Sequence, residues 1–192
     1  MKRSVTILVL LCSLIGVSGQ DGYFLRLNID RILIDTGDYK NYYKYDLGDN
    51  FLYLGRYENN LKLMILDKQS KRVVYNRIDT LSDAIILKPK FFTDKKKSVL
   101  ILMVEVAAEY SWGQEVILIK DQQPKLIGYI DCLTDLDNGT SIADHCRFQF
   151  LKEKILMTFD DVPIKCEPEE SKKIKGGDLK FELDMNGIKI ID

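Results

Sequence analysis

A nearly unbroken apolar run, Val99 to Ala108, constrains the fold of this 192-residue chain more than any other feature. Short runs of branched apolar residues favour strands, and a strand without polar alternation must be covered on both faces. Turn residues at Ser111–Gln114 lead into a second apolar run, and a third run ends near Asp131. This stretch predicts a three-stranded antiparallel meander whose first strand is central and is the most buried in the chain.

Shorter apolar runs elsewhere extend the same pattern. Residues 24–30 alternate apolar and polar side chains, residues 51–78 form a second meander, and two hairpins are expected at 147–159 and 179–190. No segment carries a sustained helical period. The expected fold is therefore all-β, a single antiparallel meander domain over residues 20–192. A sandwich, a barrel-like arrangement and a small propeller stay open, the last because two hairpins about fifty residues apart are weakly similar.

The first nineteen residues have the features of a secretory signal peptide. Lys2 and Arg3 precede the apolar stretch Val5–Val17, and small residues end at Gly19. The stretch is too short for a stable membrane helix. We therefore expect cleavage near Gly19 and export of a soluble protein to a periplasmic or extracellular location.

The charge balance argues against two classes of partner. The chain has 28 basic and 29 acidic residues, which are interspersed. This balance gives no electrostatic reason to bind nucleic acid or an anionic membrane. The lysines at 88, 90 and 95–97 are interpreted as a solvated turn before the central strand.

Tyrosines are concentrated between residues 36 and 50, a segment whose glycines and charged residues predict a loop. Phenol rings combine apolar area with a polar tip, so this loop could bind a glycan or a protein. The candidate binding residues are Tyr39, Tyr42, Tyr43, Tyr45 and Trp112. The alternative is that the tyrosines fold back as a lid over the core.

An acidic segment from residue 131 to residue 146 holds the other candidate site. Asp131, Asp135, Asp137 and Asp144 are oxygen donors of the kind that calcium uses, but their spacing does not match an EF-hand. A solvated acidic loop is the preferred interpretation, calcium is the alternative, and no other cofactor is expected.

Two cysteines flank this acidic segment, and the sequence predicts a Cys132–Cys146 disulfide that closes it. Cys166 would then be free or would pair between molecules. It lies in a charged segment between residues 163 and 175 that is expected to be a mobile surface loop.

Catalytic motifs are absent from the sequence. There is one histidine, His145, and no nucleophile elbow, dinucleotide fingerprint or phosphate loop. The preferred function is a non-catalytic binding module for a protein or a glycan. The alternative is a carboxylate-dependent hydrolase, such as a glycosidase, whose acids the sequence does not identify.

Overall fold

The computed structural model describes residues 23–36, 39–57, 60–79, 86–94, 96, 98–107, 111–134, 140–151, 153–166 and 173–191. Within these ranges all strand pairs are antiparallel, which confirms the predicted all-β class. The only helical segments there are two short 3-10 turns, and no helix is long and apolar enough to cross a bilayer. The expected signal peptide lies outside the described residues.

The central sheet has the strand order β1-β7-β8-β9-β10. Its strands are β1 (Phe24–Leu27), β7 (Ile86–Asp94), β8 (Val99–Ala107), β9 (Ser111–Lys120) and β10 (Gln123–Ile130). The middle strand is β8, and eight of its nine residues are buried. Both the predicted meander and the predicted central, most buried strand are therefore confirmed.

The predicted turn at Ser111–Gln114 is wrong, because β9 already begins at Ser111. Val106 pairs with Gly113 but Ala107 pairs with Ser111, so one extra residue of β9 forms a bulge. Gly113 has φ +131°, and a Cβ there would lie 2.6 Å from the carbonyl oxygen of Ile130. The glycine thus marks a bulge inside a strand, which the sequence pattern does not distinguish from a turn.

The outer sheet contains consecutive strands in the order β2-β3-β4-β5-β6. These are β2 (Arg31–Thr36), β3 (Tyr39–Asp46), β4 (Asn50–Tyr57), β5 (Asn60–Asp67) and β6 (Val73–Asp79). The predicted second meander is confirmed as β4–β6. The loop predicted around the tyrosines is wrong, because Tyr39–Asp46 is a strand paired on both sides. Tyrosine has a high strand propensity, which here outweighs the neighbouring turn residues.

Two smaller sheets complete the fold. The C-terminal sheet has the order β12-β13-β16-β17, with β12 (Cys146–Leu151), β13 (Lys154–Phe159), β16 (Lys180–Asp184) and β17 (Gly187–Ile191). The small sheet has the order β11-β14-β15, with β11 (Cys132–Thr134), β14 (Pro163–Cys166) and β15 (Lys173–Lys175). The 3-10 turns are η1 (Ile142–His145) and η2 (Gly176–Asp178). Both predicted hairpins are confirmed, but the ends of the predicted 163–175 loop are strands.

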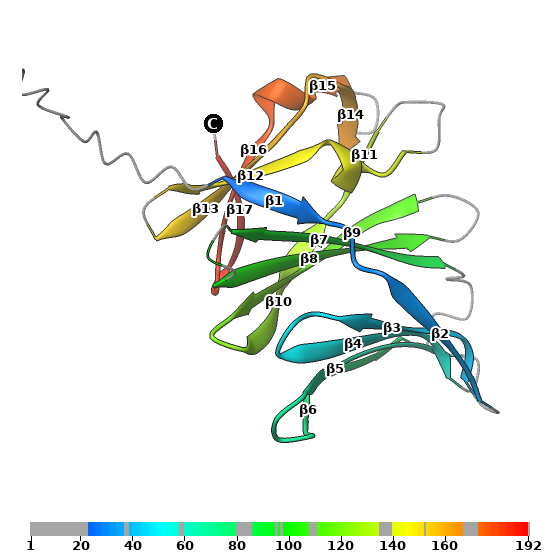
Figure 1. The fold of residues 1–192 in the computed structure, drawn as a ribbon. Helices are drawn as coiled ribbons and strands as arrows, with labels where there is room; N and C mark the ends of the chain where they lie inside the picture. The colour runs from blue at the N-terminus through cyan, green and yellow to red at the C-terminus, as the bar shows by residue number, and fades with distance from the viewer. Residues whose placement is uncertain are drawn as a thin grey trace, which may run out of the picture.

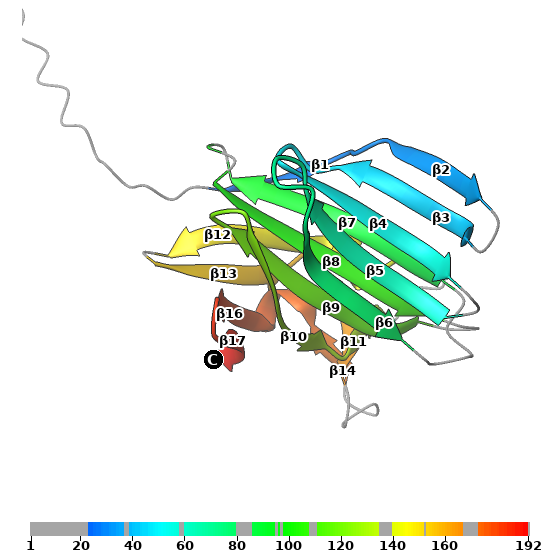
Figure 2. The same ribbon diagram turned by 90° about the horizontal axis from the view of Figure 1, so that it is seen from below.

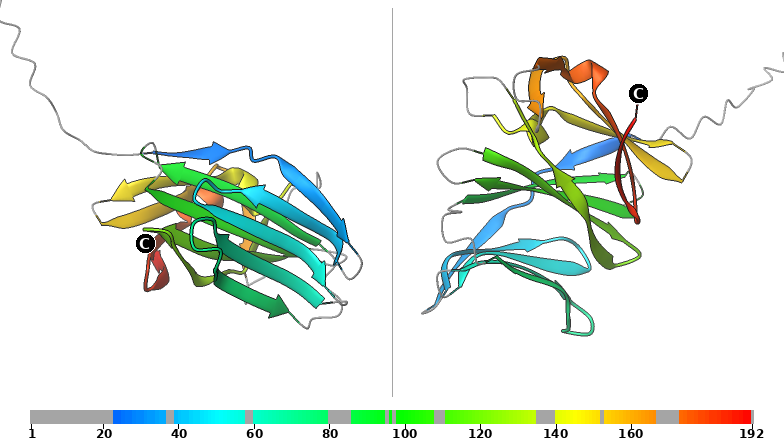
Figure 3. Two further views of the ribbon diagram at one scale, coloured as in Figure 1. Left: turned by 60° about the horizontal axis from the view of Figure 1, so that its bottom comes forward. Right: turned by 180° about the vertical axis from the view of Figure 1, so that it is seen from behind.

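The sheets are stacked in layers, with the central sheet between the outer sheet on one side and the two smaller sheets on the other (Figures 1 and 3). Ile101 and Met103 of β8 pack towards the C-terminal sheet, in what we call the C-terminal core. Leu102 and Val104 pack towards the outer sheet, in the outer core. Because both faces of β8 are covered, its sequence shows no polar alternation. The layers also distinguish this fold from blades around an axis.

The first described segment of the chain is divided between two layers. The residues 24–34 form β1 of the central sheet and β2 of the outer sheet, and Ile29 in the connection packs on the outer core. Strand β7 continues through Pro89. β1 pairs with β7 only from Phe91 to Asp94, so Pro89 lies where β7 has a free edge and its missing N–H is tolerated.

Candidate functional site: the open face of the outer sheet

The outer sheet has one buried face and one uncovered face. Leu52 and Leu54 of β4 point into the outer core, whereas Phe51 and Tyr53 alternate with them and point away from it. Seen from below, no other described strand lies in front of this sheet (Figure 2). We call the uncovered surface the open face.

The open face is unusually apolar for a solvent-facing sheet surface. The cross-strand register aligns Lys44, Tyr53, Met64 and Asn76 on it, and Asp46, Phe51, Leu66 and Val73 in a neighbouring row. Its described apolar side chains, all half-buried or exposed, are Ile32, Phe51, Tyr53, Met64, Leu66, Val73 and Ile78. An antiparallel sheet with one solvated face normally carries polar residues on that face. Burial in the core of this chain therefore does not account for the apolar side chains of the open face.

Lysine side chains lie over the aromatic rings of the open face. The Nζ atom of Lys44 is 3.6 Å from the centre of the Phe51 ring, and that of Lys68 is 4.3 Å from it. Lys68 also binds Oδ1 of Asp46 at 2.5 Å. The hydrogen bond from Lys68, followed by that from the Gly48 amide, lowers the pKa of the Asp46 carboxyl. The cations are thus placed by contacts within the sheet and keep the aromatic rings partly covered.

The predicted tyrosine cluster is divided by strand alternation, so it does not form one binding surface. Tyr45 is 6% exposed, with its ring centre 5.4 Å from that of Phe91 in the outer core. Burial raises the pKa of Tyr45. Tyr43 also packs on the outer core, and the guanidinium of Arg31 lies 4.6 Å from its ring centre. Tyr43 and Tyr45 therefore pack against the core, as the alternative interpretation of the tyrosines expects, but they do so from a strand and not from a loop.

Tyr42 points the other way, with its ring stacked on Tyr53 at 6.0 Å between centres. It is only 2% exposed, so it packs beside Tyr53 but contributes almost no accessible surface to the open face. Tyr39 belongs to β3 and Trp112 to β9, but their side chains lie outside the described part of the structure. The residues that sequence reasoning missed are Phe51, Tyr53 and Met64. The signal that could have found them is that β4 and β5 carry apolar residues at consecutive positions, so that both faces of each strand are partly apolar.

The acidic segment is only partly described. Asp135 and Asp137 lie outside the described residues, and Asp131 is exposed. Asp144 is held by two cations of the central sheet, at 2.7 Å from Arg26 and 2.8 Å from Lys90. Lys90 is therefore part of an ion-pair network and not of a solvated turn, which corrects the interpretation of that lysine.

The two ion pairs indicate that the carboxylate of Asp144 has a structural role. Burial raises the pKa of its carboxyl, but Lys90 and Arg26 together outweigh burial and lower that pKa. In the described part of the chain, no group of three or more histidine, cysteine or acidic side chains could hold a metal ion. Calcium binding by the four aspartates therefore stays a prediction.

The predicted Cys132–Cys146 disulfide is wrong in this structure, which joins Cys132 to Cys166. Strands β11 and β14 pair antiparallel and place these two cysteines directly opposite each other. Cys146 is a buried free thiol in the C-terminal core, where its Sγ donates a hydrogen bond to the carbonyl of Ile142. Burial raises the pKa of this thiol well above its ordinary value, so it stays protonated.

His145 lies between a hydroxyl and a carboxylate, in the order of a nucleophile–base–acid arrangement. Its Nε2 is 3.3 Å from Oγ1 of Thr140, and its Nδ1 is 3.9 Å from Oδ2 of Asp160. The second separation is beyond hydrogen-bond length, and Arg147 already binds Asp160 at 2.5 Å. We therefore assign no catalytic role to His145.

No protein-family model, curated protein or solved structure matches this chain.

Proposed function

We propose that this protein is an exported, non-catalytic module that binds a protein partner through the open face of the outer sheet. The observation that carries the proposal is the row of half-exposed apolar side chains across five paired strands with no described layer above them. Contiguous apolar patches on soluble proteins commonly mark interaction sites.

The size of the open face suits a macromolecular partner. Five strands about 4.8 Å apart, each of about eight residues, span roughly 20 Å by 25 Å. A partner lying flat on this area would bury surface of the same order as the roughly 800 Å² that one side of a standard protein interface buries.

The placement of the lysines favours a protein over a glycan. A sugar ring needs a free aromatic face to stack on, but Lys44 and Lys68 both approach the Phe51 ring. The described charges of this face are Lys44, Lys62, Lys68 and Asp46, which gives an excess of cations. A partner with an apolar centre and an acidic rim would be complementary to it.

Export is supported by the character of the first nineteen residues and is compatible with the Cys132–Cys166 disulfide. The protein recovered from outside the producing cell should begin near Gln20. Amino-terminal sequencing of the secreted form tests this, and a mature protein that begins at Met1 would contradict it.

The binding proposal is tested by capture from secreted extract with two matched double variants. Val73→Glu with Ile78→Glu places charges on the open face, at residues that are 49% and 51% exposed. Leu126→Glu with Ile190→Glu changes apolar residues that are 39% and 63% exposed, on edge strands of the central and C-terminal sheets. Wild type and the second variant should retain the same partner, and the first variant should lose it. Equal capture by both variants, or no partner on wild type, would contradict the proposal.

The alternative hydrolase has no specific support in the structure. A cleft between the central sheet and the C-terminal sheet is lined by two acids, Glu153 and Asp184. Oδ1 of Asp184 accepts hydrogen bonds from the amides of Asn186 and Gly187, so the role of this carboxylate is to stabilise the β16–β17 turn. The hydrolase stays an untested prediction.

A further inference from the structure

A cleft of about 650 Å³ opens between the central sheet and the C-terminal sheet, away from the open face. It lies where β8 begins and β9 ends, opposite the β12–β13 and β16–β17 turns. This volume is within the range of about 300–1,000 Å³ that is typical of small-molecule sites.

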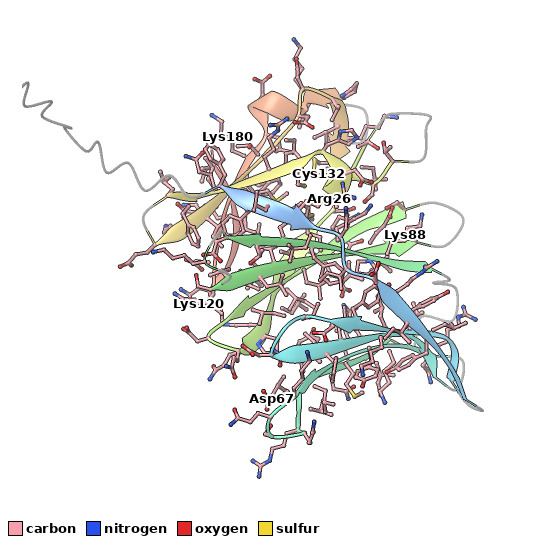
Figure 4. All side chains as sticks on the ribbon, viewed as in Figure 1. Arg26, Asp67, Lys88, Lys120, Cys132 and Lys180 are labelled. Carbon is pink, nitrogen blue, oxygen red and sulfur yellow. A yellow bond between two sulfur atoms is a disulfide. The ribbon has the colours of Figure 1, made fainter. Side chains whose placement is uncertain are left out.

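The two sheets are fastened together at the other end of this layer. There Asp144 of η1, which directly precedes β12 of the C-terminal sheet, binds Arg26 and Lys90 of the central sheet. Among the described residues that line the cleft, no ion pair joins the two sheets. Figure 4 shows Lys120 at this unfastened end of the central sheet, with Cys132 and Lys88 towards the other end. The cleft is therefore the open end of a two-sheet layer.

The floor of the cleft is continuous with the C-terminal core. Val99, Leu118, Ile155 and Leu183 are core residues that also line it. Phe150 and Met185, both half-buried, form part of its wall. Met185 is unbranched and lies in the β16–β17 turn, so it can adjust to an inserted apolar group.

Lys120, the last residue of β9, lies on the side of the strand whose preceding residues, Val116 and Leu118, are apolar. Val116 and Leu118 of β9 point into the C-terminal core, and Lys120 continues the same face into the cleft. It has no ion-pair partner among the described residues, whereas Lys154 on the opposite wall is bound by Glu182. Of the two acids that line the cleft, Asp184 is engaged by turn amides. Lys120 is thus the cation available to a ligand.

We propose that this cleft binds a small amphipathic anion, with its aliphatic body on the apolar floor and its carboxylate at Lys120. The aliphatic body gains by leaving water, and the charge-assisted contact fixes the orientation of the ligand. Glu153 on the opposite wall opposes the negative head group and so limits affinity. The site is separate from the open face, so it does not depend on the protein-binding proposal.

The test uses three single-chain probes with the same tail, titrated below the concentration at which they form micelles. They are dodecanoate, dodecyltrimethylammonium and dodecyl maltoside, and binding is measured by calorimetry with the folded full-length mature protein. Dodecanoate should bind most tightly. Equal binding of the anionic and cationic probes, or no binding of dodecanoate, would overturn the proposal.

Three variants locate the site. Lys120→Met should weaken dodecanoate binding about tenfold, which is about 1.4 kcal/mol, and leave the binding of dodecyl maltoside unchanged. Glu153→Gln should strengthen dodecanoate binding several-fold. Met185→Trp should fill the cleft and so abolish dodecanoate binding. Lys125→Met is the control, because Lys125 is an exposed lysine of β10 that does not line the cleft. Binding that responds equally to Lys120→Met and Lys125→Met, or that survives Met185→Trp in a folded variant, would refute the assignment.

Discussion

Removing the Cys132–Cys166 disulfide should lower the free energy of unfolding by about 4 kcal/mol. The two cysteines are 34 residues apart. For a loop of this length, the chain-entropy relation gives a loss of about 12.6 cal/mol/K in the unfolded state, or about 3.8 kcal/mol at 25 °C. For a chain of this size, that corresponds to a fall of roughly 8–15 °C in melting temperature.

The measurement compares the Cys132→Ala and Cys166→Ala double variant with wild type in urea, each with and without a thiol reductant. Reductant should bring wild type close to the double variant and should leave the double variant unchanged. This arm separates the cross-link from the packing of the Cys132 side chain, which belongs to the C-terminal core.

Cys146→Ala is the control that distinguishes the two pairings. If Cys132 is bonded to Cys166, this variant keeps its full sensitivity to reductant. A Cys132–Cys146 bond would close a loop of only about 15 residues, worth about 3 kcal/mol, and Cys146→Ala would abolish it. Loss of reductant sensitivity in Cys146→Ala would therefore refute the pairing argued here.

Three further predictions concern the layers and their ion pairs. Leu102→Ala should cost about 3–4 kcal/mol in urea unfolding, because Leu102 is fully buried, whereas Leu126→Ala on the exposed edge should cost less than about 1 kcal/mol. Arg77→Ala should cost about 2–3 kcal/mol, because it leaves the buried carboxylate of Glu115 without its cation; Arg77 is one-third exposed, so the full buried-pair penalty does not apply. The pKa of Asp144 is lowered in the folded state, so the stability it contributes is present above pH 4 and is lost as the pH falls through the folded pKa. Asp144→Asn should therefore reduce stability at neutral pH and flatten the acid limb below pH 4 in a series of urea titrations, and an unchanged acid limb would contradict this.

The fold was predictable from sequence where one local signal is sufficient. The run Val99–Ala107 has no polar alternation, which is the pattern of a strand covered on both faces. The last hairpin was likewise predictable from its alternating strands, but its two-residue turn is Met185-Asn186 and not Asn186-Gly187, because Asp184 pairs with Gly187. The stacking of three layers was less accessible, because it depends on which strands pair across long stretches of chain, as β1 does with β7.

The single tyrosine surface expected from the sequence is divided in the structure, for a different physical reason. Adjacent tyrosines in a strand point to opposite faces, so Tyr42 and Tyr43 could not share one surface once the segment became β3. The disulfide was missed because β11 pairs with β14 and not with the strand that follows the acidic segment. Strand β14 has only four residues, which is too short for an apolar alternation around Cys166 to predict that it pairs with β11.

The double covering of β8 has a consequence for how its alignment with β7 is specified. A one-residue slip normally moves apolar side chains from the core to solvent and is strongly opposed. In β8 the same slip would place one set of apolar residues in the core that the other set now fills, so hydrophobicity opposes it only weakly. The polar groups at the β7–β8 turn supply the missing constraint: Asp94 accepts hydrogen bonds from the Val99 amide and the Ser98 hydroxyl, and Thr93 donates to the Val99 carbonyl. The alignment of this apolar strand is thus fixed by polar hydrogen bonds at one of its ends.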